Sequence, residues 1–126
     1  MRQIAPANSK PIGPYTPGIQ ADNILFTSGQ LGGTDPDIQV QAKGACENIK
    51  AILEAAGFGF EDVVKTTCYL TDIADFAAFN EIYGQYFISK PARSCFAVKE
   101  LPVKGAKIEI EAIAVRESSQ GSYITA

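Results

Sequence analysis

Residues 107–115 read Lys107-Ile108-Glu109-Ile110-Glu111-Ala112-Ile113-Ala114-Val115, a run in which apolar and polar side chains alternate. Successive side chains of a β-strand point to opposite faces of its sheet, so the period of two predicts a strand. One face would carry Ile108, Ile110, Ala112 and Ala114, which suits burial under helices. The other face would carry Lys107, Glu109, Glu111, Ile113 and Val115. This segment therefore predicts a sheet that helices cover on one side.

Two upstream segments have the spacing of helices. Between Val40 and Ala56 the apolar residues recur at three- and four-residue steps, and Gly57 stands at the stop position. A second helix is expected after Asp72, a plausible N-cap with Asp75 three residues later. Its apolar side would hold Phe76, Phe79, Asn80, Tyr83, Tyr86 and Phe87. Such a stripe is more often core than a cofactor site, so we interpret it as core.

The remaining elements complete an α+β pattern. Residues 6–18 form a breaker-rich arm, and residues 24–28, 63–71 and 92–98 are expected strands. In the second strand, one face would hold Val64, Thr66, Cys68 and Leu70. With Cys46, Cys68 is assigned to the core. Two helices on one face of a mixed sheet make an α+β sandwich, and 126 residues suit a single domain, 1–126.

The other face of the sheet has nothing in the chain to cover it. We place Leu25, Ile113 and Val115 there, which makes that face too apolar for solvent. Burial against further copies of the chain is the natural solution, so a homo-oligomer is expected. Residues 117–126 are polar and rich in serine, and we expect a loose tail.

Composition excludes several classes of function. The chain has no histidine, and its three cysteines form no CxxC pair, which excludes Ser-His-Asp, Cys-His, His-ligated zinc and paired-His ribonuclease mechanisms. We therefore expect no metal and no dinucleotide cofactor. The net charge of −3 argues against nucleic-acid or anionic-membrane partners. No apolar stretch approaches a membrane span and no leader is evident, so a cytoplasmic protein is expected.

Three places could carry chemistry, and each has an ordinary alternative. Arg93 and Cys95 would share a strand face, where an arginine fork could grip a carboxylate; the alternative is a surface ion pair. Glu109 and Glu111 could divide acid and base roles, or simply pair with Lys107 or Lys65. The Ser28-Gly29 step permits close backbone approach to a ligand, or is a plain turn. With no histidine to activate it, Cys95 is interpreted as a structural or oxidation-sensitive cysteine rather than a nucleophile.

Five motifs in order carry a resemblance. They are Ile12-Gly13-Pro14-Tyr15, Phe26-Thr27-Ser28-Gly29-Gln30, Val64-Lys65-Thr66-Thr67, Pro91-Ala92-Arg93-Ser94 and Lys107-Ile108-Glu109-Ile110-Glu111-Ala112. Over about residues 10–116 the chain resembles the RidA/YjgF family, the imine deaminases also described as endoribonucleases of the L-PSP type. The resemblance implies a chorismate-mutase-like fold in a homotrimer, with ligand clefts between subunits. It further implies cofactor-free hydrolysis of 2-aminoacrylate-type enamines and imines to 2-oxo acids and ammonia.

The resemblance also implies roles for single residues. Arg93 would bind the substrate carboxylate, and Glu109, rather than Glu111, would lie beside the attacking water and leaving nitrogen. Tyr15 and Ser28 would line the cleft, while backbone groups of Gly29 and Cys95 hold substrate or water. Many family members have a longer loop than residues 31–39 here, which leaves substrate range open. The alternatives are a single-stranded RNA endonuclease, disfavoured by acidity and absent histidine, and a non-enzymatic ligand-binding or chaperone-like protein.

Overall fold

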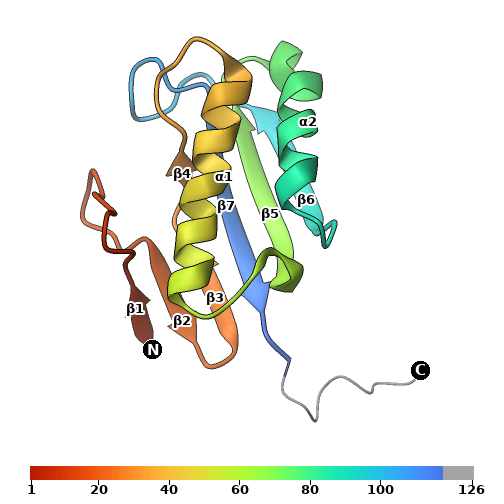
Figure 1. Cartoon of the computed structure of the whole chain (residues 1–126). Helices are drawn as coiled ribbons and strands as arrows, with labels where there is room; N and C mark the ends of the chain where they lie inside the picture. Colours follow the sequence, from red (N-terminus) through yellow and green to blue (C-terminus); the bar gives the residue numbers. More distant parts are fainter. Residues whose placement is uncertain (118–126) are drawn as a thin grey trace.

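The computed structural model describes residues 1–117. Its strands form one mixed sheet, and its helices pack on that sheet (Figure 1). The strands are β1 (Arg2–Ile4), β2 (Gly18–Ala21), β3 (Ile24–Thr27), β4 (Gln30–Leu31), β5 (Val63–Leu70), β6 (Ala92–Ala97) and β7 (Ile108–Val115). Their order is β1-β2-β3-β7-β5-β6, and β4 also pairs with β7. Only the β5–β6 pair is parallel among these described strands. Of the expected tail, residues 118–126 lie outside the described residues.

Both helices, α1 (Ile38–Ala55) and α2 (Phe76–Tyr86), cover the same side of the sheet (Figure 1). The Asp37 side chain begins α1 by accepting a 2.8 Å hydrogen bond from the Gln39 backbone nitrogen. Gly57 follows the helix with a φ of 78°, a left-handed conformation that glycine adopts without strain. Asp72 caps a short 3₁₀ turn, Ile73–Asp75, and α2 begins only after that turn. Both expected helices are thus confirmed, with shifted starts.

The core lies between these helices and the inner face of the sheet. Ile108 and Ile110 of β7 are fully buried against it, as the alternation predicts, and so are Cys46 and Cys68. Ile49 of α1 and Phe79 of α2 are likewise fully buried. Each such aliphatic or aromatic side chain stabilises the fold by about 1.5–3 kcal/mol. Burial on this scale fixes which face of β7 points outward, and therefore where Glu109 lies.

The outward face differs from the prediction at two places. Leu25 is fully buried rather than outward, because its register partner is Ala114, which itself faces the helices. The prediction for Leu25 is therefore wrong, and Phe26 takes the outward position with 43% exposure. A bulge between Val63 and Lys65 turns Val63 into the core and leaves Val64 exposed, the reverse of the predicted faces. Ile113 and Val115 are half-buried, as expected for the outward face.

Candidate active site

An open cavity of about 470 Å³ lies over one end of β7. Four expected site residues line it: Tyr15, Ser28, Gly29 and Glu109. Apolar side chains complete the wall: Ile12, Leu31 and Pro102. The cavity thus joins the arm, the β3–β4 connection, β7 and the loop before β7, segments far apart in the sequence.

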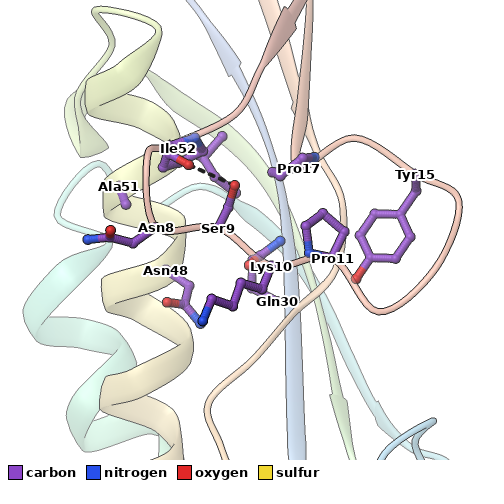
Figure 2. A pocket seen from close by; sticks show the side chains of 11 residues that line it. Asn8, Ser9, Lys10, Pro11, Tyr15, Pro17, Gln30, Asn48, Ala51 and Ile52 are labelled. Atoms are coloured by element: carbon purple, nitrogen blue, oxygen red, sulfur yellow. Dashed lines mark hydrogen bonds between the residues drawn. The ribbon is translucent and has the colours of Figure 1, made fainter.

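Tyr15 reaches the cavity from the arm. Its backbone nitrogen donates to the Gly13 carbonyl at 2.9 Å, and its hydroxyl accepts a long 3.4 Å bond from the Ile12 nitrogen. The arm and α1 enclose a second cavity, of about 240 Å³, which Tyr15 also lines. Figure 2 shows the arm folded against α1, with Tyr15 on the side away from the helix. The phenol is 44% exposed, which leaves it available to a ligand or a neighbouring subunit.

Ser28 ties this arm to the sheet. Its hydroxyl donates to the Thr16 carbonyl at 2.5 Å, and its backbone nitrogen donates to the Pro17 carbonyl at 2.8 Å. Because the hydroxyl hydrogen is already used, a ligand would meet Ser28 as an acceptor. These two bonds fix the part of the cavity wall that Ser28 forms.

Gly29 is required by close packing against Glu109. A Cβ on Gly29 would lie 2.5 Å from Oε2, 2.6 Å from Cδ and 2.9 Å from Cγ of Glu109. Atoms at van der Waals contact stand about 3.5–4.0 Å apart, so any larger residue would displace the carboxylate. Glycine was expected here because it permits a ligand to approach the backbone closely. In the structure the group that approaches Gly29 is the Glu109 side chain of the same chain.

Glu109 lies on the outward face of β7, half-buried. Burial raises the pKa of its carboxyl above the usual range, and the charge of Glu111 raises it further. Glu111 accepts a hydrogen bond from the Tyr69 hydroxyl. The lysines that could have paired with the two glutamates donate elsewhere: Lys107 to the Pro36 carbonyl at 2.7 Å, and Lys65 to Ser94 Oγ at 3.4 Å. Glu109 is thereby suited to accept and return a proton.

Arg93 lies on the opposite face of the sheet. Its register partner on β5 is Thr66, which is buried under the helices. The guanidinium donates from Nη1 to Asn80 Oδ1 at 2.8 Å and lies 4.7 Å from the Tyr83 ring centre and 5.3 Å from that of Phe76. These cation–π contacts and the amide hold the fork rigidly. Arg93 thus lines its own cavity, of about 500 Å³, instead of forming an ordinary surface ion pair.

Cys95 shares the face of Arg93, as predicted from their spacing. Burial raises the pKa of its thiol, an effect that the Arg93 charge partly opposes. A thiol in this state is a poor nucleophile, which agrees with the structural interpretation. Among residues 1–117, no three His, Cys, Asp or Glu side chains gather as a metal ion would require.

A single chain therefore brings only some of the predicted site residues together in one cavity. Tyr15, Ser28, Gly29 and Glu109 share a cavity, whereas Arg93 and Cys95 lie across the sheet from it. The aromatic and amide groups that hold Arg93 are Phe76, Asn80 and Tyr83, whose helical spacing had predicted core positions instead. The signal was an amide, Asn80, within an otherwise aromatic stripe. No helix of the described part of the chain is long and apolar enough to cross a membrane.

Comparison with known proteins places this arrangement in a family. The family model described as Endoribonuclease L-PSP matches residues 5–116. The 2-iminobutanoate/2-iminopropanoate deaminase of Escherichia coli K12 is 46% identical over 115 residues, covering 83% of this chain and 89% of the relative. Two solved structures from E. coli, the YjgF gene product and TdcF with bound serine, superpose with TM-scores of 0.86 and 0.84. Each is 42% identical, covering 93% of this chain and all of the other. The chain belongs to the RidA/YjgF family, also known by the L-PSP name, and shares its α+β fold.

Proposed function

We propose that the protein is a hydrolytic deaminase of 2-imino acids and their enamine tautomers, yielding 2-oxo acids and ammonia. The observation that carries this proposal is Glu109, a carboxylate of raised pKa pressed against the Gly29 backbone in a small-molecule-sized cavity. The kinship with a 2-iminobutanoate/2-iminopropanoate deaminase supports the substrate class. The serine bound to TdcF supports a ligand that carries a carboxylate and a neighbouring nitrogen.

The active assembly is a homotrimer in which two subunits complete each site. Arg93 and Glu109 lie on opposite faces of one sheet, so a ligand that touches both must bridge two copies. The outward face carries exposed apolar side chains, Phe26, Val64 and Phe96, which gain from burial against a second copy. The family resemblance is the reason for choosing three subunits. In this assembly Arg93 of one subunit grips the substrate carboxylate beside Glu109 of the next.

The reaction needs no histidine because the substrate supplies the electrophile. A water oxygen attacks the carbon of the protonated imine while Glu109 takes a proton from that water, and the C=N π electrons move onto nitrogen. Glu109 then returns the proton to nitrogen. The hydroxyl electrons form C=O, the C–N bond breaks, and the hydroxyl proton leaves with ammonia as ammonium. The raised pKa of Glu109 suits a group that acts first as a general base and then as a general acid.

Positioning supplies the rest of the catalysis. Arg93 is already oriented by Asn80 and Tyr83, so gripping a carboxylate costs little further ordering. Because imines hydrolyse appreciably in water, lowering the barrier by about 3–4 kcal/mol gives a rate gain on the order of several hundredfold.

The test is release of 2-oxo acid and ammonia from freshly generated 2-iminopropanoate. Truncating one partner of a desolvated charge pair costs about 2–5 kcal/mol, so Arg93→Ala should lose roughly 30-fold to several thousandfold in kcat/KM. Arg116→Ala is the matched control, since Arg116 also lies over an aromatic ring, Phe58, and donates to the Gly57 carbonyl outside both cavities. Equal rates for Arg93→Ala and wild type would overturn the assignment. Carboxylate binding without turnover would instead favour a ligand-binding protein.

A further inference from the structure

Glu111 is a second carboxylate beside the site, and the reaction above does not use it. It follows Glu109 by two residues on the same face of β7, but it does not line the cavity that Glu109 enters. A side chain so near a proton-transferring group and yet outside the ligand space can act only through its charge and its contacts.

Tyr69 holds Glu111 in that place. The register of β5 and β7 sets Tyr69 opposite Glu109, yet its hydroxyl donates diagonally to Glu111 Oε1. Phe96 of β6 packs edge-on against the Tyr69 ring, with centroids 5.3 Å apart and planes at 85°. The bond to Glu111 is the first cause that raises the pKa of Tyr69, to about 12, so the phenol stays a donor throughout the working pH range.

We propose that Tyr69 and Glu111 are positioning residues for Glu109. The phenol anchors the Glu111 carboxylate beside the cavity, where it acts as a fixed negative charge on Glu109. A nearby like charge disfavours ionisation, so this pair adjusts the proton affinity of the group that handles the proton. The anchor also keeps Glu111 from turning into the cavity and competing for the substrate nitrogen.

The other groups around Glu109 do not duplicate this effect. Tyr15 lines the same cavity, where its hydroxyl accepts from the Ile12 nitrogen, and the Lys107 ammonium is engaged with the Pro36 carbonyl. The loop that contributes Pro102 carries further charges: Lys99, Glu100 and Lys104. Of all these groups, Glu111 is the one whose charge bears on the Glu109 pKa, alongside burial. In the proposed trimer Arg93 of a neighbouring subunit adds a positive charge, but it is common to wild type and to variants at Glu111.

The inference is tested by following the Glu109 carboxyl carbon by NMR through a pH titration of the full chain. In Glu111→Gln, which keeps an acceptor for Tyr69 and removes the charge, the Glu109 midpoint should move to lower pH. Glu47→Gln is the matched control: Glu47 also accepts from a tyrosine hydroxyl, Tyr86 at 2.7 Å, but between the helices. There the Glu109 midpoint should stay in place. An unchanged Glu109 midpoint in Glu111→Gln would overturn the inference.

A second variant tests the anchor. In Tyr69→Phe, Glu111 loses the donor that holds its carboxylate, so its Cγ methylene should become more mobile in NMR relaxation measurements; unchanged mobility would contradict the anchoring role. The consequence for catalysis rests on the proposed function. If that function holds, the acidic limb of kcat/KM moves to lower pH in Glu111→Gln, because Glu109 must be ionised to accept a proton from water. The titrations need no turnover, so failure of the positioning role and failure of the deaminase assignment are distinguishable.

Discussion

Replacing Gly29 by alanine should separate catalysis from stability. The new Cβ would stand 2.6 Å from Glu109 Cδ, and ordinary contact is about 3.5 Å, so the carboxylate must retreat by about 1 Å. The side chain is flexible and Gly29 has no positive φ, so the fold itself can absorb the change. A displacement of about 1 Å at a reacting group costs about a hundredfold in rate. Gly29→Ala should therefore lose about that factor in kcat/KM and little in melting temperature.

Gly33→Ala is the control, and it should lose stability while keeping catalytic activity. Gly33 has a φ of 94° with open space around it, so Gly33→Ala strains the backbone by about 1–2 kcal/mol without touching Glu109. Its melting temperature should fall while kcat/KM is retained. Both variants are assayed by ammonia release from 2-iminopropanoate and by thermal unfolding. Wild-type kcat/KM in Gly29→Ala would refute the placement of Glu109 at the reacting atoms.

Three further outcomes are expected. Glu109→Gln should abolish turnover yet raise the melting temperature at neutral pH. The folded-state pKa of Glu109 lies above its unfolded value, so ionisation penalises folding, and the gain should shrink as pH falls through the folded pKa. Tyr83→Phe should destabilise the fold by about 1–3 kcal/mol in denaturant titration, since it leaves the buried Thr66 hydroxyl without its 2.7 Å partner; no loss would contradict this. Phe26→Asp should dissociate the proposed homotrimer in sedimentation analysis; an intact trimer would exclude this face as the interface.

The alternation of residues 107–115 was sufficient to predict β7, its buried face and the outward place of Glu109. The spacing of Arg93 and Cys95 likewise predicted their common face. The alternation could not predict strand register or the position of a bulge. Leu25 is buried because it pairs with Ala114, and one bulge exchanges the buried and exposed positions of Val63 and Val64. A period of two carries no information about which strand pairs with which residue, or where a bulge interrupts it.

For the candidate site, the sequence could indicate a set of residues but not how they are arranged in space. Sequence spacing placed Arg93 and Glu109 on strands but could not say that the two strands present them on opposite sides of the sheet. The cradle of Arg93 was missed because Asn80 and Tyr83 follow the periodicity of a core stripe. Their polar atoms take on their roles only once α2 is packed over β6.

Subunit complementation tests the shared site most directly. Arg93→Ala and Glu109→Gln chains, each expected to have lost most or all of its activity, are unfolded together and reassembled in equal amounts. If each site takes Arg93 from one subunit and Glu109 from its neighbour, half of the sites keep the arginine and half of those keep the glutamate. About one quarter of wild-type deaminase activity should then return. Activity no higher than that of the separate variants would contradict a site shared between subunits.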